Sequence, residues 1–342
     1  MKFWRIFCMK IRENRKIWLL AGLFVLLLVS FIICTAVGAV SMTPSEMWAV
    51  FTGRGKESYV NILLYIRLPR VAACALAGAG LAVSGAVIQN VMQNPLAGPN
   101  IIGVNAGAGL GVVLCSALFP YAYSAVPLAA FAGALLAVAF IYLLARRTGA
   151  SRVTLVLAGV CINSLLNAAA DLIHTLADDT VSSTYGFRLG GFSAINNKVL
   201  LPAGVLIVVG IVIVILLHNE LEVMSLGESV AASVGLHIRF YRAVFLLVAA
   251  VLAGASVSFA GLIGFVGLIA PHIARKLVGE ECRYLLPFTA MFGACFVMLC
   301  DLLARTVAAP YEIPTGVVLS CLGAPFFLHL LLHKRGNSHD GM

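Results

Sequence analysis

The most informative part of the sequence is residues 67–111, which read RLPRVAACALAGAGLAVSGAVIQNVMQNPLAGPNIIGVNAGAGLG. Small residues recur at four-residue spacing on both sides of a polar corner with two prolines, residues 93–100: Gly78, Ala82 and Ala86 precede it, and Gly103, Gly107 and Gly111 follow it. Helices in lipid associate through close approach over small residues, because no hydrophobic gain holds them together. A polar, non-helical corner at membrane depth needs protein or water to satisfy its backbone. The stretch therefore predicts two closely packed helices in a bundle around a pathway.

The composition is typical of an integral membrane protein. Of the 342 residues, 61% are hydrophobic and 11% are charged, and the mean hydropathy is +1.03, whereas soluble domains carry about 25% charged residues. The net charge of +9 could suggest nucleic-acid binding, but the basic residues lie in short flanks between apolar runs instead of on one face. We expect them to set the membrane topology, and we expect no contact with nucleic acid.

Ten apolar stretches predict an all-α protein with ten transmembrane helices in a single domain, residues 1–342. The stretches are residues 17–40, 71–91, 101–119, 126–145, 153–173, 199–217, 243–260, 262–274, 285–303 and 313–332. A helix needs about 20 residues to cross the hydrocarbon core, so the short stretch 262–274 either crosses or re-enters. The first stretch is longer than the core of a signal peptide, and we expect an uncleaved crossing.

The distribution of Lys and Arg favours ten crossings. With ten crossings and a cytoplasmic N-terminus, 16 of the 23 Lys and Arg residues lie on the cytoplasmic side, and the number falls to 12 if residues 262–274 do not cross. Cytoplasmic flanks are enriched in positive charge. We therefore expect ten crossings with both termini in the cytoplasm.

The two halves of the chain echo each other. In each half an Arg-x-x-Arg pair, Arg67 with Arg70 and Arg239 with Arg242, precedes a run of small residues with serine and then a proline. By the crossing count, the first of these helices runs inward and the second outward. We expect two inverted-repeat-like halves, residues 67–173 and 239–333, an arrangement in which many transporters place a site at the interface.

A polar stripe marks the fifth apolar stretch. Asn163, Asn167, Asp171 and His174 fall within one narrow helical face. Polar groups inside a bilayer are costly and usually face a bundle interior or a wet cavity, so we interpret the stripe as a wall of the pathway. Hydrogen bonding between helices near the outer surface is the alternative. A metal or proton relay with Asp171 and His174 fits the spacing, but two ligands make a weak metal site.

The longest polar interruption on the predicted inner side is residues 218–238. Ser225 to Glu228 has the pattern of a helix start with an acid in the first turn. A short amphipathic helix here is either a docking element for a soluble partner or a surface helix on the lipid headgroups.

Motifs of catalysis are absent from the sequence. No GxxxxGK[ST] occurs, and residues 53–56 imitate it without its spacing. HExxH and GxSxG are absent as well. None of the nine cysteines belongs to a CxxC pair, so we interpret them as small core residues. We expect no enzymatic activity and no cofactor, and any ATP hydrolysis must take place in another chain.

Taken together, these features resemble the FecCD/BtuC-type permeases of bacterial ATP-binding cassette importers for iron complexes, haem and cobalamin. The resemblance covers nearly the whole chain. It is carried by RLPR at 67–70, SGA at 84–86, NPLAGP at 94–99, GV at 103–104, GAG at 107–109, LGE at 226–228, GFVGLIAPHIAR at 264–275, EIPTG at 312–316 and GAP at 323–325.

The resemblance implies a BtuC-like permease fold in the bacterial inner membrane, paired with a second copy of itself or with a paralogous permease. The implied partners are two cytoplasmic ATP-binding subunits and an extracytoplasmic substrate-binding protein.

The resemblance also implies roles for particular residues. Arg67, Arg70 and Arg305 would meet acidic residues of the binding protein, and the crossing count places all three outside; anchoring to lipid headgroups is the alternative. Residues 218–238 would be a coupling segment that docks on the ATPase, and its key members are Leu226, Gly227, Glu228, Ala231 and Gly235. The turn at Ala150, Ser151 and Arg152 would belong to the inner gate, and the fifth and tenth stretches would line the pathway.

These expectations amount to import of an iron complex by alternating access. A ferric siderophore is the substrate we favour, and haem and cobalamin are alternatives. The rival from another class is a stand-alone ion-coupled carrier that uses Asp171 and His174 as a relay. Co-purification with a nucleotide-binding protein distinguishes the two.

Overall fold

The computed structural model describes residues 2–38, 42–147, 152–177 and 184–336, and these residues form helices joined by short links, without strands. The helices that coincide with predicted crossings are α1 (Lys2–Ala36), α4 (Leu68–Met92), α5 (Val104–Leu118), α6 (Val126–Arg147), α7 (Arg152–Leu176), α10 (Asn197–Leu216), α13 (Ile238–Ala260), α14 (Val266–Val278), α15 (Cys282–Thr306) and α16 (Thr315–Gly336). The shorter ones are α2 (Pro44–Phe51), α3 (Glu57–Val60), the π-helix η1 (Asn61–Arg67), the 3-10 helix η2 (Tyr123–Ala125), α9 (Tyr185–Leu189), α11 (His218–Ser225) and α12 (Glu228–Ser233).

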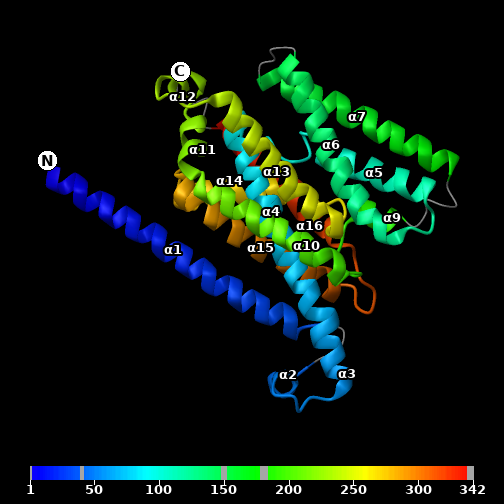
Figure 1. Cartoon of the computed structure of the whole chain (residues 1–342). Helices are drawn as coiled ribbons and strands as arrows, with labels where there is room; N and C mark the ends of the chain where they lie inside the picture. Colours follow the sequence, from blue (N-terminus) through cyan, green and yellow to red (C-terminus); the bar gives the residue numbers. More distant parts are fainter. Residues whose placement is uncertain (1, 39–41, 148–151, 178–183, 337–342) are drawn as a thin grey trace.

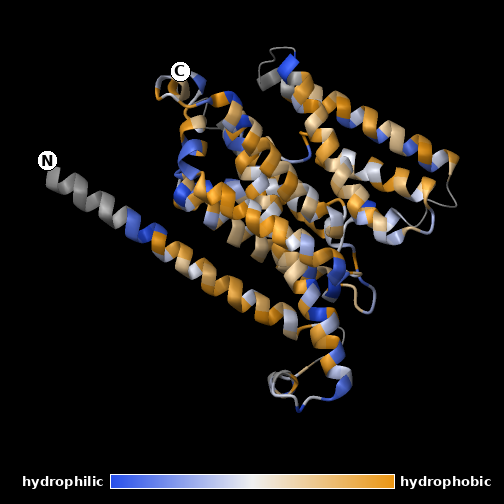
Figure 2. Cartoon of the chain, viewed as in Figure 1, coloured by the Kyte–Doolittle hydropathy of each residue, from blue (hydrophilic) through white to orange (hydrophobic). Residues whose placement is uncertain are grey.

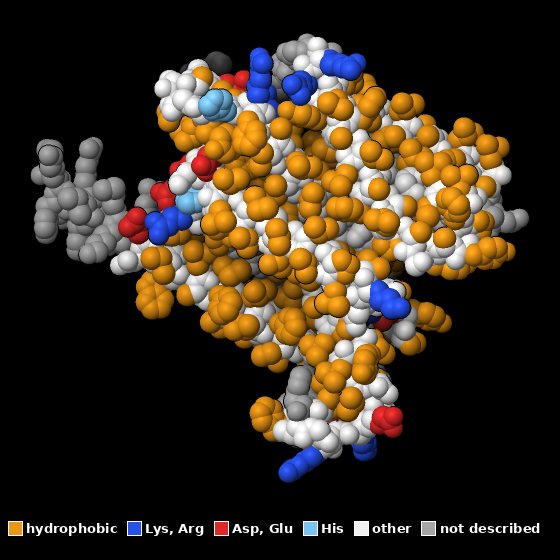
Figure 3. Space-filling model, in the orientation of Figure 1, with side chains coloured by type: hydrophobic (Ala, Val, Ile, Leu, Met, Phe, Trp, Pro, Cys, Tyr) orange, Lys and Arg blue, Asp and Glu red, His pale blue; other side chains and the backbone are white. Residues whose placement is uncertain are grey.

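Each of the ten predicted apolar stretches lies on a helix. Among the described residues, seven helices are long and apolar enough to cross a membrane by themselves. Two of the other three, α5 and α14, have 15 and 13 residues. Figure 2 shows apolar residues along the helices and hydrophilic residues gathered toward α11, α12 and the helix ends. Figure 3 shows a mostly hydrophobic surface with charged side chains near its edges.

The buried helix α4 is the centre of the bundle and packs against α10, α13, α14 and α15 (Figure 1). Its two ends are called here the Arg70 end and the Gln93 end. Asp301 of α15 pairs with Arg70, and Cys282 at the start of α15 lies beside Asn90. Helix α15 therefore runs antiparallel to α4.

The same reasoning decides the path of the short helix α14. Ser84 donates to the carbonyl of Ala249 while Gly80 lies beside Ser256, so α13 also runs antiparallel to α4. Since α13 and α15 both run toward the Arg70 end, the segment between them must return the chain to the Gln93 end. The geometry agrees with a crossing through α14 and not with a re-entrant loop, as ten crossings require.

Small residues bring the helices of the bundle into backbone contact. A Cβ atom added to Gly78 would meet the carbonyl of Gly293, and one added to Gly85 would meet the carbonyl of Gly267. Gly107 of α5 meets Gly133 of α6 in the same way. The predicted close packing on both sides of the corner is confirmed.

Both ends of the described chain point toward the Gln93 end of α4. Lys16 of α1 pairs with Glu281 at 2.7 Å, next to the start of α15, and α1 finishes beside Arg67. Helix α16 begins beside Asp301, at the Arg70 end, and runs the other way. The even number of crossings expected from the sequence requires this arrangement.

Candidate transport pathway and docking sites

A buried cluster of charges closes the Arg70 end of the bundle. Nε and Nη2 of Arg70 donate to the carboxylate of Asp301 at 3.0–3.2 Å. Nη1 donates to Glu312 at 2.9 Å. Arg305 pairs with Asp301 at 3.2 Å, and the hydroxyl of Thr315 donates to the same carboxylate at 2.9 Å. Asp301 is 1% exposed, and its carboxylate is the counter-charge of two buried guanidinium groups, those of Arg70 and Arg305.

The three arginines predicted to dock a binding protein are all buried in this conformation. Arg67 is 4% exposed and donates to the carbonyl of Ala36 at 2.7 Å. Arg305 is 7% exposed and donates to the carbonyl of Cys34 at 2.8 Å. The side chain of Glu312, by contrast, is 44% exposed. Glu312 is thus the exposed partner of the buried Arg70.

A cavity of about 360 Å³ opens at this place. Its walls include Phe187, Phe259 and Thr315, and both Arg70 and Glu312 face it. Backbone hydrogen bonds hold the surrounding segments together; the amide of Leu262 donates to Phe187 at 2.9 Å, that of Gly191 to Ala260 at 2.8 Å, and that of Gly316 to Gly190 at 3.1 Å. The cavity combines apolar walls with an ion pair.

The predicted polar stripe lies on α7, but its members have different surroundings. Nδ2 of Asn163 donates to the carbonyl of Asn100 at 2.8 Å, which ties α7 to the corner after α4. Asn167 is exposed. Asp171 pairs with Arg188 of α9 at 3.3 Å, in a pair whose side chains are both about half exposed. That pair is screened by solvent and contributes little to stability.

His174 is the one buried member of the stripe, at 9% exposed. Its ring lies 5.8 Å from the ring of Tyr185, and both ring nitrogens lack a hydrogen-bond partner. No group of three or more His, Cys, Asp or Glu among the described residues could hold a metal ion. The residues described around His174 thus do not form a metal centre.

The predicted coupling segment forms α11 and α12, which are joined by a glycine with positive φ. Leu226 is 65% exposed, Gly227 has φ +119°, and Glu228 begins α12 and pairs with Arg242 of α13 at 2.5 Å. Ala231 is fully buried, and Gly235 turns the chain into α13 with φ +84°. An exposed leucine and acid on a pinned helical turn suit a docking surface.

The predicted inner gate lies mostly outside the residues that the structure describes. Ala150 and Ser151 lie outside the described residues, and Arg152 is the first residue of α7.

A second polar network, which the sequence did not single out, lies at the Gln93 end. Arg275 of α14 donates to Oε1 of Gln89 and, at 2.9 Å, to Oδ1 of Asn90. Nε2 of Gln93 donates to two carbonyls of α11, and the carboxylate of Glu222 accepts from the amide of Cys282 at 3.0 Å. The available signal was three amide side chains, Gln89, Asn90 and Gln93, at the C-terminal end of α4.

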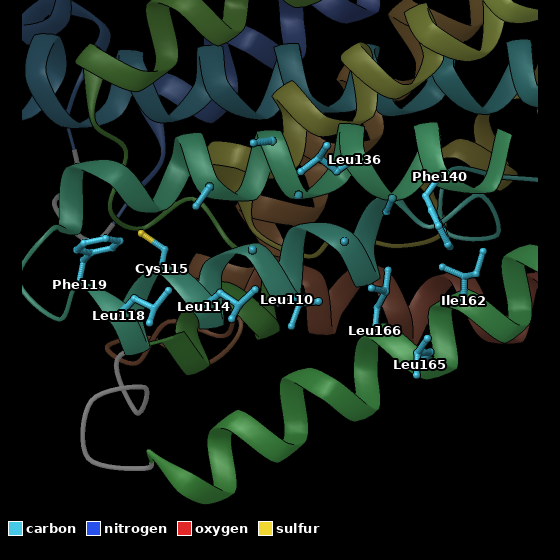
Figure 4. A pocket seen from close by; sticks show the side chains of 16 residues that line it. Leu110, Leu114, Cys115, Leu118, Phe119, Leu136, Phe140, Ile162, Leu165 and Leu166 are labelled. Carbon is cyan, nitrogen blue, oxygen red and sulfur yellow. The ribbon is translucent and has the colours of Figure 1, made fainter. Parts of the chain in front are cut away.

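The largest cavity among those described, about 480 Å³, lies between α5, α6 and α7 (Figure 4). Its lining is apolar and includes Leu110, Leu136, Phe140, Ile162 and Leu165. Binding sites for small molecules combine apolar walls with a few convergent polar groups. Since such groups are missing from this lining, the cavity does not have the chemistry to hold a charged metal complex.

Comparison with known proteins identifies the class of transporter. The family model described as the FecCD transport family matches residues 26–333. The iron(3+)-hydroxamate import system permease protein FhuG of Bacillus subtilis is 37% identical over 95% of this chain and 99% of its own length. The Fe(3+)-citrate import system permease protein YfmD of the same organism is 38% identical over 90% and 93%. The hemin transport system permease protein HmuU of Yersinia pestis is 36% identical over 93% and 96%.

A solved structure with the same fold is an inward-facing metal-chelate type ABC transporter. It has a TM-score of 0.83 and 29% identity, covering 92% of this chain and 99% of the other. The family match covers nine of the ten predicted crossings in full and the first crossing from residue 26 onward. The chain is a multi-pass transport subunit, not an enzyme, and it belongs to the FecCD transport family.

Proposed function

We propose that this chain is the permease subunit of an ATP-driven importer that takes a ferric siderophore from an extracytoplasmic binding protein to the cytoplasm. The observation that carries the proposal is the match over nearly the whole chain to permeases named for iron–hydroxamate, iron–citrate and hemin import. Two of these three names specify a ferric chelate, which favours this class over haem. Iron is cargo in this proposal and is not a resident cofactor.

The proposed assembly contains two permease subunits and two ATP-binding subunits. The permease pair consists of two copies of this chain or of this chain and a paralogue. Helix α7 supports a second permease subunit, because Leu157, Leu165 and Leu172 expose more than half of their surface and only a small part of the helix is buried in the bundle. The stripe from Asn163 to His174 would then border a pathway shared by the two subunits.

The proposed orientation places the Gln93 end of α4 in the cytoplasm of a bacterial cell and the Arg70 end outside. It follows from the positive-inside rule. Both termini are then cytoplasmic, the coupling segment faces the ATPase, and the residues 150–152 belong to the inner gate.

The coupling role of Glu228 can be separated from its ion pair with Arg242. Glu228→Arg should leave membrane insertion intact and abolish stimulation of ATPase activity by the loaded binding protein. The double variant Glu228→Arg with Arg242→Glu restores an ion pair of reversed polarity. If Glu228 docks on the ATPase, the double variant stays idle, whereas recovery of stimulation would reduce Glu228 to an internal partner of Arg242.

Docking of the binding protein would use Arg67, Arg70 and Arg305 after an exchange of partners. In this proposal a carboxylate of the binding protein enters the 360 Å³ cavity and takes the place of Glu312 on Arg70. Arg70→Ala should weaken the affinity of the permease in nanodiscs for the binding protein at least tenfold. Lys198→Ala is the control and should leave this affinity unchanged, because Lys198 is an exposed cation that does not line the cavity. Equal affinities for the two variants would exclude Arg70 from the interface.

The substrate is tested most simply on the cognate binding protein. Tryptophan fluorescence of that protein should be quenched by a ferric hydroxamate or ferric citrate at submicromolar concentration and not by haem or cobalamin. Quenching by haem alone would assign the permease to haem import and would leave its role in ATP-driven transport untouched.

A further inference from the structure

One side chain connects the predicted coupling segment directly to the central helix. Gln93 is the residue that ends α4, and its amide reaches the last turn of α11. The amide nitrogen donates to the carbonyl of Met224 at 2.9 Å and to that of Ser225 at 3.1 Å. Because both neighbours are carbonyl oxygens, the group that faces them must be the NH2 and not the oxygen of the amide.

The backbone of Gln93 has a conformation that favours glycine, although the residue is a glutamine. Gln93 has φ +48° and ψ +39°, the left-handed conformation that a glycine adopts without steric cost. Among the described residues, only Phe265 is another non-glycine residue with positive φ. Helices commonly end with glycine in this conformation. A glutamine that accepts the strain is expected where its side chain has a task.

The contact joins the proposed coupling segment to the central helix. Met224 and Ser225 immediately precede Leu226, Gly227 and Glu228, where the coupling segment turns from α11 to α12. On the other side, α4 is a buried helix of 25 residues, about 38 Å long. It reaches from Gln93 to the charge cluster around Asp301. If the ATPase displaced α11, the displacement would thus act on the C-terminal end of α4, a helix that spans the bundle.

The neighbouring hydrogen bonds connect α4 to helices other than α11, so they do not substitute for the contact between Gln93 and α11. Gln89 and Asn90 are bonded to Arg275 of α14, and Asn90 also donates to the sulfur of Cys282 at 3.3 Å. These bonds connect α4 to α14 and α15, and α11 joins the network separately through Glu222. Gln93, which caps the C-terminus of α4, is bonded to α11 itself.

We propose that Gln93 is a positioning residue that couples the ATPase-docking segment to α4, by holding the last carbonyls of α11 with its amide. The proposal rests on the proposed function and adds to it a residue outside the coupling segment. It requires that loss of the amide leaves the folded permease bound to its ATPase but disconnects ATP hydrolysis from transport.

Two variants test the contact in complementary ways. Gln93→Glu keeps the shape and replaces the donor by a carboxylate that the two carbonyls repel. Gln93→Gly removes the side chain and its two hydrogen bonds but relieves the left-handed backbone; because the two effects offset each other, the variant should remain folded. Asn197→Asp is the control for the added charge, since Asn197 lies exposed at the start of α10, outside the coupling segment.

The measurement is ATP hydrolysis and substrate uptake by the reconstituted complex of permease, ATPase and binding protein. Both Gln93 variants should retain the ATPase subunits and basal hydrolysis, and should lose at least tenfold in substrate uptake per ATP hydrolysed. Asn197→Asp should transport like the natural chain. A stable Gln93→Gly protein with unchanged uptake per ATP would overturn the proposal and leave Gln93 as a helix cap.

The natural chain distinguishes this failure from failure of the proposed function. If the unaltered permease does not bind an ATPase subunit or shows no ATP-dependent uptake, the proposed function is wrong. If it is coupled and the Gln93 variants are equally coupled, only the role of Gln93 is wrong.

Discussion

At the scale of single residues, the molecule depends on a few buried charges that compensate one another. Asp301 is the carboxylate shared by Arg70, Arg305 and Thr315 at one end of the bundle. Removal of one partner from a buried ionic group leaves the other charges uncompensated, and this costs more than the intact group contributes.

Asp301→Asn should therefore destabilise the protein strongly. We expect a loss of about 3 kcal/mol or more in the free energy of unfolding, because two guanidinium groups would remain buried without a full counter-charge. Glu312→Gln is the control; its side chain is 44% exposed, so the loss should stay below about 1 kcal/mol. Reversible unfolding in mixed micelles measures both. Similar losses for the two variants would show that burial does not set the strength of these pairs.

The roles of individual residues were the part least accessible from sequence. The spacing correctly put Asn163 and His174 on one helix, but it could not reveal that Asn163 bonds to the corner at Asn100 while His174 is buried against Tyr185. Arg70 could be recognised as important, yet its partner Asp301 lies 231 residues away in the chain. Such pairings depend on which helices touch, and periodicity within one helix carries no information about that.

At the scale of elements, packing through small residues explains why short and interrupted helices can hold together. Gly85 of α4 lies against Gly267 of α14 so closely that a side chain on either would meet backbone. The 13-residue α14 owes its place to this contact and to its neighbours on α15. The elements themselves were predictable from apolar length, whereas the crossing of α14 required the direction of its neighbours.

Gly85→Ala should destabilise the protein although alanine is the better helix former. The gain in helix propensity is about 1 kcal/mol, but the new Cβ would overlap the carbonyl of Gly267, and α4 and α14 would have to separate. Gly22→Ala on α1 is the matched control, because nothing lies within 4 Å of its added Cβ. Thermal unfolding in detergent should show a lower midpoint for Gly85→Ala and an equal or higher one for Gly22→Ala. A raised midpoint in both would mean that the helices adjust freely.

At the scale of the whole molecule, the chain is a bundle with a polar network at each end of one central helix. The network around Asp301 lies at the Arg70 end and the network around Arg275 at the other, and α4 connects them. Membrane embedding and the permease family were predictable, because composition and long ordered motifs report them. The coupling of the two ends was not, since it depends on contacts such as that of Gln93 with α11.

The central claim is that this permease works with an ATPase carried by another chain. The most direct measurement is uptake of a radioactive ferric siderophore into liposomes that contain the permease with its ATP-binding subunits, in the presence of the binding protein. We expect uptake to require ATP on the side of the membrane where the ATPase subunits lie. Uptake should stop when either the ATPase subunits or the binding protein is omitted. Uptake by the permease alone, driven by a proton or sodium gradient without ATP, would contradict the account.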